Sequence, residues 1–120
     1  MAKKCEIAYP KKGTYQMETF DSTWERDHAM DLERDPSISK WTMKHGIRIP
    51  YFYKGEKHRY EPDFLIELIN GDIEIHEVKN NKDIDNPQEQ EKFKMARLWC
   101  SIHCIYNKPN IAYKIITRDI

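Results

Sequence analysis

One stretch of twenty residues, 60–79, limits the possible folds of this chain more than any other feature. Two apolar runs flank the pair Asn70-Gly71, and both are rich in residue types that favour strands. Asn-Gly between two such runs is the strongest short signal for a β-hairpin. The sequence therefore predicts one strand over about 58–69 and a second over 73–79.

Three charged residues on this hairpin point to a chemical site. Asp63 follows Pro62 on the first strand, and Glu77 and Lys79 lie near the end of the second. Two carboxylates a few ångström apart repel one another unless a cation lies between them, and Mg²⁺ prefers oxygen ligands. A lysine beside that cation can neutralise charge that develops on a phosphate. The three residues therefore favour metal-dependent chemistry on a phosphodiester.

The three side chains can act together only on one face of the sheet, because side chains alternate along a strand. A two-residue hairpin loop would put Asp63 on the opposite face from Glu77 and Lys79. A three-residue loop, 70–72, would pair Asp63 with Lys79 and bring all three onto one face. We therefore predict the three-residue loop, with Gly71 in a left-handed conformation or an equivalent bulge.

The segment before the hairpin predicts a helix and a strand. Residues 22–34 form a helix that begins at Ser22, where Glu25 completes a capping box, and that ends before Pro36. Residues 47–52 alternate as a strand. The capping box alone explains Glu25, but Glu25 also shares the inward face of this helix.

The segment after the hairpin predicts a second helix and a last strand. Asn86 caps a helix that has Pro87 at its first position and runs to about residue 103, and residues 111–117 form a strand. The predicted inward stripe of this helix is Phe93, Ala96, Trp99 or Cys100, and His103. The element order is then α-β-β-β-α-β, an α/β fold with a mixed central sheet flanked by helices.

Length and charge set further limits. The 120 residues suit one compact domain over 21–120, after an irregular or short extended lead-in, 1–20, that is basic and aromatic. The 20 basic and 20 acidic residues cancel, whereas a protein that binds nucleic acid by itself usually has a basic excess. The neutral balance indicates a local basic patch, a recruiting partner, or no nucleic acid at all.

Cysteine number and hydropathy suggest where the protein is found. Three cysteines are an odd number in a small chain, which fits a reducing compartment better than a disulfide framework. No apolar run is as long as a membrane span, and no apolar signal region follows the first residues. We therefore expect a soluble cytoplasmic protein.

These motifs resemble those of a known group of enzymes. Pro62-Asp63 followed by Glu77-Val78-Lys79 is similar to the signature of the PD-(D/E)XK nuclease superfamily, and Glu25 stands where that superfamily carries a helix acid. The sequence around these motifs resembles that of the TnsA-type transposon endonucleases and also that of the nuclease part of type III restriction subunits. The resemblance implies a restriction-endonuclease-like fold with the αβββαβ core.

The resemblance also implies an activity and its residues. It implies a Mg²⁺- or Mn²⁺-dependent DNA endonuclease in which Asp63 and Glu77 ligate metal and Lys79 assists the attacking water. Glu25 would ligate metal or orient water. TnsA-type proteins work with partners, so a recruiting partner protein is expected, and a dimer is possible. A motor segment of the type III kind is absent from this sequence.

Several alternatives stay open from the sequence. The chain could be an inert nuclease-like module that binds DNA or a partner, or a Holliday-junction resolvase of the same fold. The spacing Cys100-x-x-His103-Cys104 suggests zinc, but a buried helical stripe explains it better. Four basic residues could contact phosphates or form a solvated helix face: Lys82, Lys92, Lys94 and Arg97. His76 is predicted on the face opposite Glu77.

Overall fold

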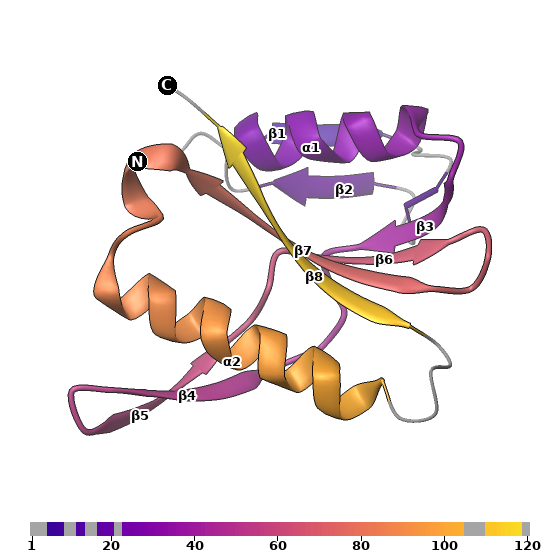
Figure 1. Cartoon of the computed structure of the whole chain (residues 1–120). Helices are drawn as coiled ribbons and strands as arrows, with labels where there is room; N and C mark the ends of the chain where they lie inside the picture. Colours follow the sequence, from indigo (N-terminus) through magenta and orange to yellow (C-terminus); the bar gives the residue numbers. More distant parts are fainter. Residues whose placement is uncertain (1–4, 9–11, 14–16, 21–22, 105–109, 119–120) are drawn as a thin grey trace.

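The computed structural model describes residues 5–8, 12–13, 17–20, 23–104 and 110–118 (Figure 1). Its helices are α1 (Thr23–Arg34), α2 (Pro87–His103) and the short 3-10 helix η1 (Asn81–Asp83). Its strands are β1 (Cys5–Ala8), β2 (Met17–Phe20), β3 (Ile38–Thr42), β4 (Ile49–Tyr53), β5 (Glu56–Tyr60), β6 (Phe64–Leu68), β7 (Ile73–Asn80) and β8 (Ile111–Arg118). Neither α-helix in this part of the chain is long and apolar enough to cross a membrane.

A four-stranded mixed sheet forms the centre of the molecule, in the order β3-β6-β7-β8. β6 pairs antiparallel with both β3 and β7. After β7 the chain passes through α2 and returns to the sheet as β8, which pairs parallel with β7. Leaving aside the β1–β2 and β4–β5 hairpins, the chain order is α1-β3-β6-β7-α2-β8. This is the predicted αβββαβ order of a restriction-endonuclease-like α/β fold.

The two helices cover opposite faces of the sheet (Figure 1). Ala29 and Leu32 of α1 pack with Phe64, Ile66 and Val78 on one face. On the other face, Ala96 of α2 belongs to a cluster of buried residues that also contains Ile49, Tyr51 and Tyr60, with Tyr113 of β8 packed against it. A residue of β7 therefore faces α1 or α2 according to its place in the alternation.

The strand predicted over 58–69 is wrong as one element, because it is two strands. Residues 61–63 separate β5 from β6, and β5 pairs with β4 in a hairpin outside the main sheet. Pro62 has no N–H to donate to a sheet ladder, so the break at this place has a simple cause. The segment 47–52 accordingly contributes to the β4–β5 hairpin, and β3 takes the first place in the core sheet.

The hairpin loop has the predicted length but not the predicted position. It is Ile69 to Gly71, because the Leu68 N–H donates to the Asp72 carbonyl (2.8 Å) and the Gly71 N–H donates to the Leu68 carbonyl (3.0 Å). Gly71 has φ +91°, the predicted left-handed conformation. Asn70 secures the turn by accepting from the Asp72 N–H at 2.9 Å.

The observed register differs from the predicted one by two residues. Leu65 pairs with Ile75, and one further step places Asp63 opposite Glu77 instead of Lys79. An even shift keeps every side chain on its predicted face. The predicted common face of Asp63, Glu77 and Lys79 therefore survives, while the predicted pairing is corrected.

The second helix begins as predicted and departs from its predicted stripe at its end. The Asn86 side chain accepts from the N–H groups of Gln88 (2.9 Å) and Glu89 (3.2 Å). Phe93, Ala96 and Cys100 are buried, but His103 is exposed and stacks on Trp99. The predicted cap at Ser22 lies outside the described residues, and so does much of the predicted lead-in, 1–20. The two described strands of the lead-in, β1 and β2, pair antiparallel.

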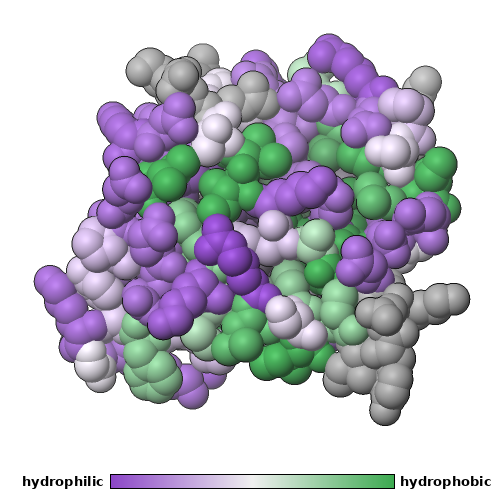
Figure 2. Space-filling model, in the orientation of Figure 1, coloured by the Kyte–Doolittle hydropathy of each residue, from purple (hydrophilic) through white to green (hydrophobic). Residues whose placement is uncertain are grey.

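The surface agrees with the polar composition. In the face shown by Figure 2, hydrophilic residues spread over the whole view, and apolar side chains gather in smaller patches between them. Among the exposed apolar side chains of the described residues are Phe52, Ile69, Leu98 and Ile102. Phe52 and Ile69 lie on different segments, whereas Leu98 and Ile102 are one turn apart on α2.

Candidate functional site

Asp63, Glu77 and Lys79 meet on the α2 face of the central sheet. Asp63 directly precedes β6, and the other two residues lie on β7. The Lys79 ammonium is 3.6 Å from Oε2 of Glu77. Asp63 and Glu77 lie close enough for their charges and hydrogen bonds to shift each other's pKa. The predicted constellation of two acids and a lysine is therefore present as a spatial cluster.

The Asp63 carboxylate is oriented by the backbone. Its Oδ2 accepts a 2.8 Å hydrogen bond from the Val78 N–H. The preceding residue is also held, because His45 Nε2 lies 2.7 Å from the Pro62 carbonyl. The Ile47 N–H donates to Nδ1 of this histidine at 2.9 Å, so the Nε2 position carries the proton and donates. The turn that carries Asp63 is thus fixed from both sides.

The Glu77 carboxylate lies in the interior and rests on a tyrosine pair. Only 7% of Glu77 is exposed. The Tyr60 hydroxyl donates to its Oε1 at 2.8 Å, and the Tyr113 hydroxyl lies 2.8 Å from the Tyr60 oxygen. Because Tyr60 gives its proton to Glu77, Tyr113 is the donor in the second bond. Burial and the nearby acid charges of the site raise the pKa of both tyrosines above the usual range.

Both acids are held in a state that resists ionisation. Burial raises the pKa of Asp63, against the Val78 hydrogen bond and the Lys79 charge, which favour the carboxylate. Burial also raises the pKa of Glu77, and the neighbouring Asp63 charge raises it further. The one positive charge of Lys79 does not balance two ionised acids. A divalent cation between the oxygens would supply the missing positive charge, so the donor set fits a hard metal ion such as Mg²⁺ or Mn²⁺.

Lys79 has a second carboxylate partner that sequence reasoning missed. Glu89, in the first turn of α2, places Oε2 3.2 Å from the Lys79 ammonium and Oε1 3.0 Å from that of Lys92. Burial alone would lower the pKa of Lys79, but Glu77 and Glu89 together raise it above the usual value. The only signal in the sequence is that Glu89 is the third residue of a helix capped by Asn86. Helix caps attract acids for other reasons, so this signal carries little weight.

Glu25 belongs to helix α1 and not to the hairpin segment that carries the cluster. It belongs to the first turn of α1, which packs on the opposite face of the sheet, and its side chain is partly exposed. In the part of the chain that the structure describes, no three His, Cys, Asp or Glu side chains are arranged to hold one metal ion. The structure therefore brings Asp63 and Glu77 together, and the role of Glu25 as a third ligand stays a prediction.

The other predicted residues divide between the site and the surface. Lys92 and Arg97 approach the tyrosine pair, with their cationic groups 5.8 Å from the Tyr60 ring centre and 6.0 Å from that of Tyr113. Lys82 and Lys94 are exposed. In the segment 100–104, Cys100 is buried, Cys104 is half-buried and His103 is exposed, so only Cys100 belongs to the buried stripe.

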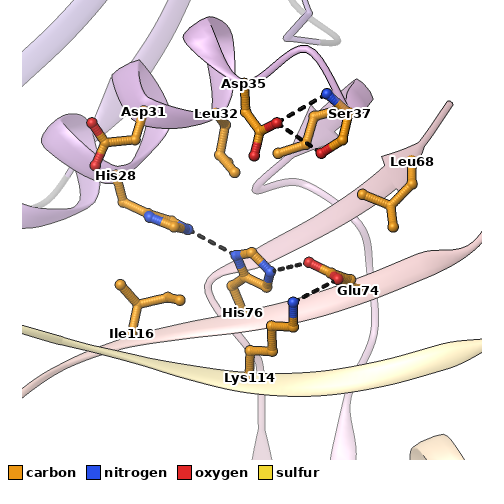
Figure 3. A pocket seen from close by; sticks show the side chains of 11 residues that line it. His28, Asp31, Leu32, Asp35, Ser37, Leu68, Glu74, His76, Lys114 and Ile116 are labelled. Carbon is orange, nitrogen blue, oxygen red and sulfur yellow. Dashed lines mark hydrogen bonds and ion pairs between the residues drawn. The ribbon is translucent and has the colours of Figure 1, made fainter.

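A cavity of about 370 Å³ lies on the opposite face of the sheet, under α1. Figure 3 shows a chain of polar contacts along it: His28 meets Nδ1 of His76 (2.8 Å), and Nε2 of His76 meets Glu74 (2.8 Å). Lys114 pairs with the same glutamate at 2.8 Å. The position of this cavity under α1 confirms that His76 faces away from Glu77. The two histidines, Glu74 and Lys114 are hydrogen-bonded or paired with one another.

Comparison with known proteins gives one family. The family described as TnsA-like endonuclease N terminal matches residues 35–118. This match spans Asp63, Glu77, Lys79 and Glu89 and begins after the helix that carries Glu25. No curated protein matches the chain.

Proposed function

The chain belongs to the TnsA-like endonuclease family, and from this premise we propose that it hydrolyses DNA phosphodiester bonds at the cluster of Asp63, Glu77 and Lys79. The observation that carries the proposal is the pairing of two inward-facing carboxylates with a lysine on one face of the sheet. An ordinary structural ion pair needs one acid, whereas this cluster concentrates acids whose repulsion a cation would relieve.

The proposed cofactor is Mg²⁺, with Mn²⁺ as a substitute. When bound, it would lower the pKa of a water molecule and offset negative charge on the phosphate. Asp63 and Glu77 would hold it, Asp63 through a carboxylate already aimed by the Val78 N–H and Glu77 through one aimed by Tyr60. Each acid is thus pre-oriented by the fold.

Lys79 would stabilise charge that develops during the attack. Its pKa is raised by Glu77 and Glu89, so its side chain stays an ammonium at neutral pH. An ammonium cannot accept a proton, and the proposed role of Lys79 is therefore electrostatic: it orients the water and neutralises oxygen charge on the phosphate. As the water oxygen bonds to phosphorus, the bond from phosphorus to one ester oxygen breaks. The attacking water releases a proton to solvent and the leaving oxygen takes one from solvent, which yields a phosphate end and a hydroxyl end.

DNA binding is proposed to depend on local charge and on a partner protein. The chain as a whole is neutral, but Lys92 and Arg97 lie at the edge of the site and Lys94 is exposed on the same helix. These residues would contact phosphates. Three contacts give weak, salt-sensitive binding, so a recruiting protein would supply the remaining affinity.

The test is conversion of supercoiled plasmid to open circles. We expect nicking with Mn²⁺ or Mg²⁺ and none with EDTA. DNA ligase joins only a 5′-phosphate to a 3′-hydroxyl, so it should reseal the nicks made by the wild type when the 3′ oxygen is the one that leaves. Metal-dependent nicks with 5′-phosphate and 3′-hydroxyl ends would support the proposal. Absence of nicking at every metal concentration, with and without partner-containing extract, would contradict it.

A further inference from the structure

Glu89 is the nearer of the two carboxylates that contact Lys79. The ammonium lies 3.2 Å from Oε2 of Glu89 and 3.6 Å from Oε2 of Glu77. The two glutamates come from different elements, since Glu77 lies on β7 and Glu89 on α2. Lys79 is thus tied to the helix as well as to its own strand.

The Glu89 side chain is itself held in place. Its backbone N–H donates to the Asn86 side chain at 3.2 Å, which fixes the start of the helix. Its second carboxylate oxygen accepts a hydrogen bond from the Lys92 ammonium at 3.0 Å. The side chains of Lys79, Glu89 and Lys92 are only 18–23% exposed. Partial burial weakens solvent screening, so this chain of charges has a more defined geometry than a surface ion pair.

The proposed reaction places conflicting demands on Glu77. The same carboxylate would hold the cation, accept from Tyr60 and balance the Lys79 ammonium. A carboxylate that binds a divalent ion gives up much of its negative charge to it, so its hold on the lysine weakens. Glu89 has no such second task in the described structure, because its other contact is with a cation.

We propose that Glu89 is a positioning residue for the reaction: it holds the Lys79 ammonium at the edge of the carboxylate pair, and Lys92 holds Glu89. This inference rests on the proposed nuclease function and adds a residue to it that the motif does not contain. The expected consequence is that the Lys79 side chain loses its fixed position when the Glu89 charge is removed.

The first experiment separates turnover from binding. Single-turnover nicking is measured for Glu89→Gln, which keeps the side-chain shape and removes the charge. We expect the rate at saturating DNA to fall about tenfold to a hundredfold, as for a misplaced catalytic group, while the Mn²⁺ dissociation constant stays unchanged. Asp85→Asn is the matched control, since it removes one acid from an exposed position just before the same helix. A fully active Glu89→Gln would overturn the proposal.

A double-mutant cycle tests whether Glu89 acts through the lysine. In the Lys79→Ala background there is no ammonium to position, so Glu89→Gln should cause no further loss of rate. Losses that multiply in the double variant would mean that Glu89 acts by another route, and this result would also overturn the proposal.

A third measurement does not need cleavage. The Lys79 ammonium group is followed by NMR of ¹⁵N-labelled protein, and its signal is assigned with Lys79→Ala. In the wild type, we expect an ammonium signal of restricted mobility, which Glu89→Gln converts to a mobile one. If the wild type never cuts DNA, the proposed function fails, but this signal still decides whether Glu89 positions the lysine. An unchanged signal in Glu89→Gln would show that it does not.

Discussion

The backbone N–H of Val78 donates a 2.8 Å hydrogen bond to Oδ2 of Asp63. Val78 lies between Glu77 and Lys79 on β7, and Asp63 lies in the turn before β6. One bond therefore fixes the position of an acid from one segment against the acid and lysine of another. It also explains how the Pro-Asp and Glu-x-Lys motifs cooperate in three dimensions: the residue between the two charged positions supplies the donor.

This bond predicts different stabilities for two variants of Asp63. Asp63→Asn keeps an acceptor for the Val78 N–H and removes a charge that burial disfavours, so the metal-free protein should be at least as stable as the wild type. Asp63→Ala leaves the donor without its acceptor, at a cost of about 1–3 kcal/mol. Urea unfolding in EDTA measures both. An Asp63→Asn variant less stable than Asp63→Ala would contradict this account of the bond.

The pH dependence of stability should report the raised pKa of Glu77. Burial and the Asp63 charge raise this pKa from 4.5 to about 8. Between these values the folded protein binds a proton at Glu77 that the unfolded chain has released. The contribution of Glu77 to the free energy of unfolding is therefore fully present below about pH 4.5 and is lost as the pH rises towards 8. Glu77→Gln removes this contribution.

The measurement is the difference in unfolding free energy between wild type and Glu77→Gln, in EDTA, from pH 5 to 8. We expect the wild type to lose on the order of a few kcal/mol relative to the variant across this window. The comparison cancels titrating groups outside the cluster, such as His76, whose pKa burial lowers. Asp63 and Lys79 interact with Glu77, so their response is part of the measured difference. A difference that stays constant with pH would contradict the raised pKa.

The tyrosine pair predicts unequal effects of removing its two hydroxyls. Tyr60→Phe takes the donor from the buried Oε1 of Glu77, at a cost of about 1–3 kcal/mol, whereas Tyr113→Phe leaves that bond intact. Thermal unfolding of both variants in EDTA tests this order. Equal losses of stability would show that the hydrogen bond from Tyr60 to Glu77 adds nothing beyond the bond between the two tyrosines.

Divalent metal should stabilise the protein through the two acids of the cluster. At a Mn²⁺ concentration one hundred times the dissociation constant, the wild type should gain about 2.7 kcal/mol. Asp63→Asn and Glu77→Gln should gain little. Glu61→Gln is the matched control, because Glu61 is exposed and pairs with Arg48, and it should respond like the wild type. A response that survives in Asp63→Asn would place the metal elsewhere.

Glu25 is expected to contribute less to metal binding than either acid of the cluster. It lies on α1, on the other face of the sheet, so Glu25→Gln should leave the Mn²⁺ affinity of the free protein unchanged. Isothermal titration measures this. A loss as large as that in Asp63→Asn would make Glu25 a metal ligand and would require α1 to approach the cluster.

Local signals in the sequence predicted most of the central fold. Asn70-Gly71 and the apolar runs around it gave the β6–β7 hairpin, and Asn86-Pro87 gave the start of α2, because both depend on neighbouring residues only. The shared face of Asp63, Glu77 and Lys79 followed from alternation. Alternation survives an even shift, which is why the two-residue error in register did not alter the site.

The features that the sequence did not predict depend on distant contacts. Glu89 reaches Lys79 because α2 crosses that face of the sheet, and Tyr60 meets Glu77 because the chain breaks at Pro62 and lets β5 leave the sheet. Neither contact has a fixed sequence spacing. Glu25 was predicted from the motif and from its place on the inward face of its helix. That helix packs on the opposite face of the sheet, and a role for Glu25 in the site stays a prediction.

The role of the cluster in catalysis is tested by plasmid nicking with three proteins purified in the same way: wild type, Asp63→Asn and Glu61→Gln. Asp63→Asn keeps the hydrogen bond from Val78 and should stay folded, so a loss of activity would report the missing charge and not unfolding. We expect Mn²⁺-dependent nicking by the wild type and Glu61→Gln, and none by Asp63→Asn. Equal nicking by all three would show that the cluster of Asp63, Glu77 and Lys79 is not the active site.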